Sequence, residues 1–228
     1  MSRPGVLASG RPVVETLLDL LLPAVCPLCH EAPGPGLCAA CLPQLPALLD
    51  PCPLCGMPKR ESPCPACRDD GLIHLDGVQA GFAYRGMMRR LVGDAKAGAR
   101  PAAVTALAGL LPLPEAPVDA VVAVPPSPGR RPGPHLASAC ARLAAQRLGV
   151  PLIAPLRCTR HAREQHRLSR PERARNVVGL FACSGQVPKR VLLVDDILTS
   201  GATASAAAAV LRANGARRVV ASFLCRAI

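Results

Sequence analysis

One segment of 13 residues, Val191–Thr203, constrains the fold of this chain more than any other. It begins with four apolar residues, continues with Asp195, Asp196, Ile197 and Leu198, and ends in a loop of small residues that leads into an alanine-rich run. The apolar run predicts a buried strand, and the alanine-rich run predicts a helix that stops at Asn214-Gly215. A strand, a short loop and a helix in direct succession are typical of a parallel α/β sheet.

The rest of the chain after residue 70 repeats this alternation. Strands are expected at 77–84, 119–124, 151–155, 190–194 and 218–224. Helices are expected at 86–96, 100–111, 135–148 and 201–213. Buried strands that alternate with helices imply a mostly parallel sheet with helices on both faces. Prolines at 112–117 mark a linker, so residues 71–228 divide into a helical part, 71–117, and a core, 118–228.

The loop that follows the apolar strand has the composition of an anion-binding site. Its residues are Thr199, Ser200, Gly201, Ala202 and Thr203. Small side chains allow the backbone to approach a ligand closely, and the helix that follows directs backbone N–H groups and a positive dipole end at it. The preceding carboxylates would repel a phosphate unless they bind something else. Sugar hydroxyls or a Mg²⁺ ion would satisfy them.

A duplicated cysteine module precedes the α/β region. Eight of the 12 cysteines form C-x-x-C pairs. The pairs are Cys26/Cys29, Cys38/Cys41, Cys52/Cys55 and Cys64/Cys67. The first two pairs recur as the last two at an offset of 26 residues, and even the Pro-Leu filler of the first pair is repeated. Such self-similarity indicates an internal repeat, here of C-x2-C-x8-C-x2-C.

This spacing is typical of zinc ribbons, in which two C-x-x-C turns complete one tetrahedron of thiolates. A module of roughly 40 residues buries too little core to fold alone, so metal must supply folding free energy. Two structural zinc ions are therefore expected in a double ribbon at 26–70, rather than disulfides, an iron–sulfur cluster or redox thiols. The spacing leaves open whether the pairs combine sequentially or interleave; the duplication favours the sequential arrangement. His30 is a possible competing ligand.

The remaining features concern location and charge. Residues 1–25 are expected to form an amphipathic helix, because Val14, Leu17, Leu18 and Leu21 recur at helical spacing while Glu15 and Asp19 exclude a signal sequence. No apolar stretch is long enough for a membrane span, and a cytoplasmic location is expected. The net charge of +12 favours polyanionic partners. Seven arginines and two glutamates lie between Arg157 and Asn176. This stretch either contacts phosphate groups or forms a solvent-exposed face without a ligand.

The apolar strand, the two acids and the Thr-Ser-Gly-Ala-Thr loop resemble the type I phosphoribosyltransferases. The resemblance implies that Asp195 and Asp196 are catalytic-site residues that hold the ribose 2′- and 3′-hydroxyls. It also implies that Thr199–Thr203 hold the 5′-phosphate of phosphoribosyl pyrophosphate, with Mg²⁺ as cofactor. The arginine-rich stretch then corresponds to the hood that closes over pyrophosphate.

Further motifs extend the resemblance over nearly the whole chain. They are the paired cysteines, Phe82–Gly86, Arg163–Gln165, Leu168-Ser169, Glu172-Arg173 and Asn176–Phe181. Together they are similar to the ComF family. That similarity implies a double zinc ribbon fused to a phosphoribosyltransferase-like domain, associated in some bacteria with DNA uptake in natural transformation. Single-stranded DNA is therefore an expected partner beside phosphoribosyl pyrophosphate.

One segment departs from the family pattern. The loop that should cradle pyrophosphate after the strand at 119–124 is here rich in proline, Ser127–His135, with Arg130 and Arg131 left to supply positive charge. No acceptor pocket is recognisable in the sequence, so no acceptor can be named, and two alternatives stay open. One is a genuine phosphoribosyltransferase acting on a nucleobase or other small acceptor, and the other is a regulator that senses the metabolite.

Overall fold

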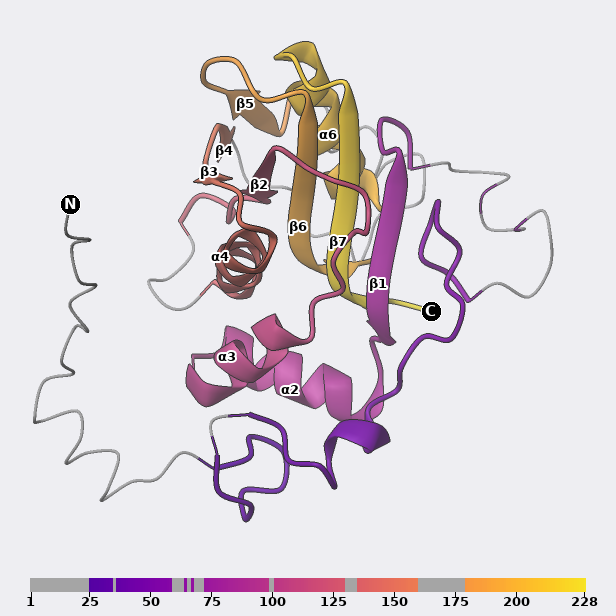
Figure 1. Cartoon of the computed structure of the whole chain (residues 1–228), viewed down its shortest axis with the longest axis vertical. Coiled ribbons are helices and arrows are strands. Elements are labelled where there is room, and N and C mark those ends of the chain that lie inside the picture. The colour runs from indigo at the N-terminus through magenta and orange to yellow at the C-terminus, as the bar shows by residue number, and fades with distance from the viewer. Residues whose placement is uncertain are drawn as a thin grey trace, which may run out of the picture.

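The computed structural model describes residues 25–34, 36–58, 64, 67, 72–98, 101–129, 135–159 and 179–228. A central parallel sheet, drawn in Figure 1, contains five strands in the order β1-β7-β6-β2-β3. The strands are β1 Gly77–Ala83, β2 Ala120–Ala123, β3 Leu152–Ile153, β6 Arg190–Leu198 and β7 Arg218–Arg226. The predicted α/β class and the parallel sheet are therefore confirmed. The amphipathic helix expected at 1–25 falls almost wholly outside the described residues.

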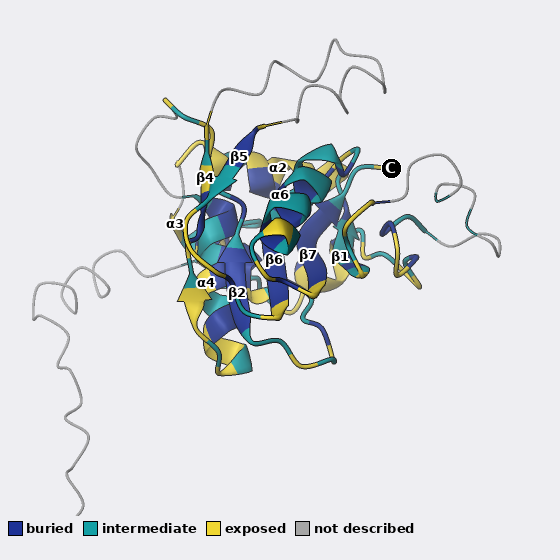
Figure 2. Cartoon of the chain, turned by 90° about the horizontal axis from the view of Figure 1, so that it is seen from above, coloured by how far each residue is buried: buried dark blue, intermediate teal, exposed yellow. Residues whose placement is uncertain are grey.

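Helices cover both faces of this sheet, as the sequence predicts. They are α2 Gly86–Lys96, α3 Pro101–Gly109, α4 Leu136–Leu148 and α6 Ala202–Ala213. One apolar core joins α2, α3 and α4 to one face, and it includes Val121, Leu192 and Leu224. The other core joins α6 to the opposite face, and it includes Leu193 and Phe223. Figure 2 shows that β2, β6 and β7 are mostly buried.

The cysteine-rich segment packs along β1, which would otherwise be an exposed edge strand. The amides of Leu48 and Val78 donate to the carbonyls of Gly81 and Pro53, at 2.9 and 2.7 Å. Covering an edge strand with another segment removes a site for unwanted strand pairing. The only regular element described before β1 is a 3-10 turn, η1, at Leu42–Gln44.

The structure differs most from the predicted elements in two places, and elsewhere the bounds shift by a few residues, as in β3, which is shorter than the strand expected at 151–155. Strand β6 runs beyond Val194 to Leu198, because β7 continues to pair with it as far as Leu198↔Arg226 while β2 ends earlier. A separate antiparallel pair, β4 Leu156–Cys158 with β5 Phe181–Cys183, flanks the arginine-rich stretch and was not predicted. Short strands held by partners distant in sequence carry little local signal. Within the described parts of the chain, no helix has the length and apolarity needed to cross a bilayer.

Candidate functional site

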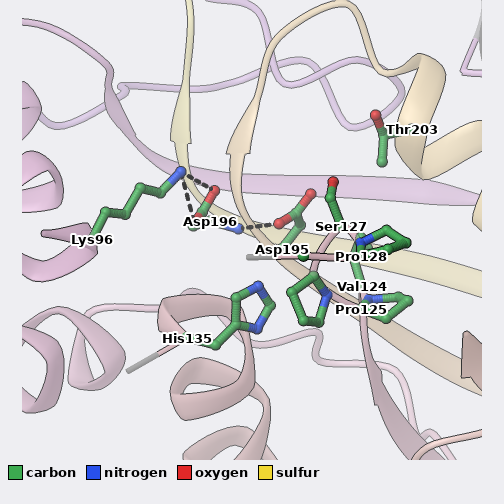
Figure 3. Close-up of a pocket in the computed structure, with 11 residues that line it drawn as sticks. Lys96, Val124, Pro125, Ser127, Pro128, His135, Asp195, Asp196 and Thr203 are labelled. Atoms are coloured by element: carbon green, nitrogen blue, oxygen red, sulfur yellow. Dashed lines mark hydrogen bonds and ion pairs between the residues drawn. The ribbon is translucent and has the colours of Figure 1, made fainter. Parts of the chain in front are cut away.

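The strand order reverses direction between β2 and β6, and the candidate site lies there. From β2 the chain proceeds to β3 on one side, and from β6 it proceeds to β7 on the other. Ligands of open α/β sheets bind outside the carboxyl ends of the strands at this type of switch point. An open pocket of about 600 Å³ lies at this position (Figure 3). Its lining is Lys96, Val124, Pro125, Pro126, Ser127, Pro128, Gly129, His135, Asp195, Asp196 and Thr203.

Two adjacent carboxylates and one lysine form the charged part of this pocket. Asp196 is one of two polar residues that are buried among those the structure describes, the other being Ser222. Lys96, at the end of α2, places its Nζ 2.9 and 2.8 Å from the two carboxylate oxygens of Asp196. The amide of Asp196 donates to Oδ1 of Asp195 at 2.8 Å. The ion pair with Lys96 thus offsets the free-energy cost of burying the Asp196 carboxylate. The half-buried Asp195 faces the pocket (Figure 3).

The environment of Asp195 favours its protonated form. Burial, together with the neighbouring Asp196 carboxylate, raises the pKa of Asp195 from 3.8 to about 7, although the Asp196 amide and Lys96 oppose the shift. Two carboxylates in one site behave in this way because like charges disfavour joint ionisation. A carboxyl group with a pKa near neutrality is suited to exchange a proton, or to bind a cation that displaces the proton.

We therefore expect Asp195→Asn to stabilise the ligand-free protein, increasingly so from pH 6 to pH 8. A raised carboxyl pKa means that the native state binds the proton more tightly than the unfolded chain. Stability is consequently lost as pH rises from about 4 through about 7. The asparagine side chain can still accept the hydrogen bond from the Asp196 amide, but it carries no charge. Its stability advantage over wild type should grow by on the order of 1 kcal/mol across this range. Denaturant titrations at both pH values measure it, and an advantage that is constant or reversed would contradict it.

The predicted phosphate loop is only partly in contact with this pocket. Thr203, in the first turn of α6, lines it, whereas Thr199, Ser200, Gly201 and Ala202 are not among the lining residues. Gly201 adopts a left-handed conformation with φ of +80° and immediately precedes the helix. The predicted residues Arg130 and Arg131 lie outside the described residues.

Sequence reasoning missed Lys96, and it included His135 only as the last residue of the proline-rich loop that the family resemblance assigns to pyrophosphate. Lys96 lies 100 positions before Asp196, in the helical part of the chain. It is nevertheless one of only three lysines in a chain with 27 basic residues, which is a signal that could have singled it out. His135 directly precedes α4, and its Nδ1 lies 2.7 Å from Oγ of Ser138. Because α4 follows β2 and α6 follows β6, two helix N-termini flank the pocket and favour an anion there.

The eight paired cysteines form two groups, and the pairs combine sequentially. The first group is Cys26, Cys29, Cys38 and Cys41, and the second is Cys52, Cys55, Cys64 and Cys67. Within each group, all sulfur atoms lie within 4.8 Å of one another. His30 belongs to neither group. All 12 cysteines are free thiols, so the paired cysteines form no disulfides. The sequential arrangement that the duplication favours is therefore the one found.

The geometry of both groups fits a tetrahedral zinc ion. Zn–S bonds of about 2.3 Å require neighbouring sulfurs to be about 3.8 Å apart. The Sγ–Sγ distances are 3.9 Å for Cys29–Cys38, 3.6 Å for Cys52–Cys67 and 3.7 Å for Cys55–Cys64. Burial opposes ionisation of Cys26, but backbone amides outweigh it and lower the pKa of that thiol to about 6. Each group could hold a metal ion through four thiolates, an arrangement that has no open position for catalysis.

The chain was compared with known proteins on the basis of its sequence. No protein-family model matches it, and no curated protein matches it either.

Proposed function

We propose that this chain binds phosphoribosyl pyrophosphate with Mg²⁺ at the pocket between β2 and β6, as a ComF-like protein. The observation that carries the proposal is the adjacent pair Asp195 and Asp196, just beyond the point where β2 stops pairing with β6, together with Lys96, which is paired with Asp196. Adjacent carboxylates accept hydrogen bonds from vicinal hydroxyls or bind Mg²⁺. A cationic side chain and two helix N-termini favour anionic groups on the same ligand.

The size and charge of the pocket agree with such a ligand. A volume of about 600 Å³ lies in the range of small-molecule sites, roughly 300–1,000 Å³. A ribose with a 5′-phosphate and a 1-pyrophosphate combines the hydroxyls and the anions that the lining side chains select. When bound, Mg²⁺ would supply charge neutralisation for the pyrophosphate, held through the Asp195 and Asp196 carboxylates. The Lys96 ammonium group would then leave the Asp196 carboxylate and pair with a phosphate oxygen.

Calorimetric titration of the full chain with phosphoribosyl pyrophosphate, with and without Mg²⁺, tests this proposal. Binding should be measurable and should tighten with Mg²⁺. Ribose 5-phosphate and pyrophosphate, titrated separately, should bind more weakly, because each engages only part of the site. The absence of heat with phosphoribosyl pyrophosphate, or equal affinity for pyrophosphate alone, would refute it.

A second candidate function is phosphoribosyl transfer itself, and the pKa of Asp195 near 7 favours it. In such a transfer, the bond from ribose C1′ to pyrophosphate breaks and a bond from C1′ to an acceptor nitrogen forms. The acceptor's proton would pass to the Asp195 carboxylate, and pyrophosphate would leave with the bonding electrons. Release of pyrophosphate with a panel of nucleobases and small amines distinguishes this enzyme from a protein that only binds or senses the metabolite.

We further propose single-stranded DNA as a macromolecular partner, from the charge of the chain. The net charge is +12, and seven arginines lie between Arg157 and Arg175. Of these seven, the structure describes Arg157 alone, which is exposed on β4. With three phenylalanines, one tyrosine and no tryptophan, the chain offers few stacking platforms, so binding should be electrostatic and indifferent to base sequence. The thiol clusters suit a reducing compartment, and we place the protein in the cytoplasm.

Replacing Arg167, Arg170 and Arg173 by Ala should therefore flatten the salt dependence of DNA binding. If all three contact phosphates, the log–log slope should fall in magnitude by about two units, at ~0.7 per contact on a single strand. Fluorescence anisotropy with a labelled oligonucleotide at several salt concentrations measures the slope. Arg217→Ala and Arg218→Ala form the control, because both residues are exposed at the amino end of β7, outside the arginine-rich stretch. An unchanged slope in the triple variant would show that DNA binds to another part of the chain.

A further inference from the structure

The two four-cysteine groups lie on different faces of the sheet, and only the second adjoins the loop at 199–203. Leu28, Leu37 and Leu45, from the segment of the first group, pack with the core of α2, α3 and α4. Cys52 and Cys55 belong to the opposite core, together with Leu198 and residues of α6. The two modules therefore share a sequence pattern, but they pack against different cores of the α/β region.

A single side chain connects the second group to the loop. Arg226 is the last residue of β7 and is half-buried. Its Nε donates to the carbonyl of Cys55 at 3.0 Å, and its Nη1 donates to the carbonyl of Leu198 at 3.0 Å. Nη1 also donates to the carbonyl of Thr199. One guanidinium thus holds a residue of the metal-binding turn, the end of β6 and the start of the loop.

Direct packing joins the same two regions. A Cβ atom added at Gly201 would lie 1.7 Å from Cδ2 of Leu72, so Leu72 rests directly on the loop backbone. A Cβ atom added at Gly56, next to Cys55, would lie 3.4 Å from Cδ2 of Leu198. Leu72 follows the second cysteine group in the chain, and Figure 1 shows the segment of that group running beside β1, near the C-terminus. The middle of the loop therefore contacts Leu72, just after the second module, and Leu198, just before the loop, contacts the turn of that module at Gly56.

We propose that the second four-cysteine group positions the loop at 199–203 for its anionic ligand, with Arg226 as the positioning residue. This inference rests on the proposed function, because the ligand is the 5′-phosphate of phosphoribosyl pyrophosphate. Zinc fixes the turn at 52–55 and hence the carbonyl that Arg226 holds. Without the metal, the loop must be ordered when the ligand binds, which costs affinity. Loss of zinc from the first group leaves these contacts intact.

The duplication supplies a matched pair of variants for the test. Cys38 and Cys64 are equivalent positions of the repeat, and both are half-buried. Cys38→Ser and Cys64→Ser should each lower the zinc content by one ion per chain. Cys64→Ser should weaken phosphoribosyl pyrophosphate binding by about tenfold, a typical size for an indirect coupling, whereas Cys38→Ser should not. Arg226→Met should weaken binding similarly while both zinc ions are retained, and Arg226→Lys should restore part of the affinity.

Amide hydrogen exchange of the ligand-free chain gives a second readout that does not need the ligand. Exchange at 198–204 should accelerate in Cys64→Ser and in Arg226→Met, but not in Cys38→Ser. If Cys64→Ser fails to fold, the exchange and affinity of Arg226→Met alone test the coupling. Failure of the wild-type chain to bind phosphoribosyl pyrophosphate would overturn the proposed function alone. Wild-type affinity and unchanged exchange in Arg226→Met would overturn the coupling alone.

Discussion

Cys26→Ser is expected to lose one of two zinc ions and to unfold residues 25–45 while the sheet remains folded. A structural zinc ion supplies on the order of 10 kcal/mol to a module of this size. The described part of this segment has η1 as its only regular element and few backbone hydrogen bonds, such as Cys26 N to Ala32 O at 2.8 Å. Besides the metal, the segment is held by the packing of Leu28, Leu37 and Leu45 against the core of α2, α3 and α4. The sheet should stay folded, because most residues of its two apolar cores come from the strands and helices after residue 77.

Native mass spectrometry and amide hydrogen exchange measure this outcome. Wild type should carry two zinc ions, and Cys26→Ser should carry one, with fast exchange confined to 25–45. Cys183→Ser, which replaces a half-buried thiol on β5 outside both groups, is the control and should retain two. Iron in the purified protein, or slow exchange at 25–45 in the Cys26 variant, would show that the assignment of structural zinc is wrong.

The double variant Asp195→Ala, Asp196→Ala is expected to bind phosphoribosyl pyrophosphate at least about a hundredfold more weakly than wild type. Each charge-assisted hydrogen bond that is lost contributes about 1.5–3 kcal/mol, and two such losses account for a factor of that size. The variant also loses the carboxylates that would hold Mg²⁺, so the enhancement by Mg²⁺ should disappear. Both effects come from the two adjacent carboxylates that line the pocket.

Calorimetry with and without Mg²⁺ measures both effects. Asp119→Ala is the control, because Asp119 is paired with Arg190 at the start of β6, away from the pocket. It should bind within about twofold of wild type, as expected for a surface ion pair. An affinity of the double variant equal to that of the Asp119 variant would exclude the carboxylate pair from the ligand site.

The sequence alone determined the features that depend on local spacing. The period of apolar residues predicted α2 with the bounds that are observed, and Asn214-Gly215 marked the end of α6. The repeat at an offset of 26 residues predicted two separate thiolate groups. The apolar run before Asp195 predicted a central parallel strand. Apart from the cysteine repeat, each signal lies within about one element, where the backbone geometry fixes which side chains share a face.

Only the tertiary structure decided which distant residues meet. Lys96 reaches Asp196 across 100 positions, because α2 ends beside the carboxyl end of β6. Gly201 was expected to leave room for a phosphate, but its missing Cβ makes room for Leu72 from the segment after the second cysteine group. Parallel pairing of β1 with β7 joins opposite ends of the α/β region. Such contacts depend on how elements pack rather than on residue spacing. A periodic pattern shows that a face is buried but does not identify the segment that covers it.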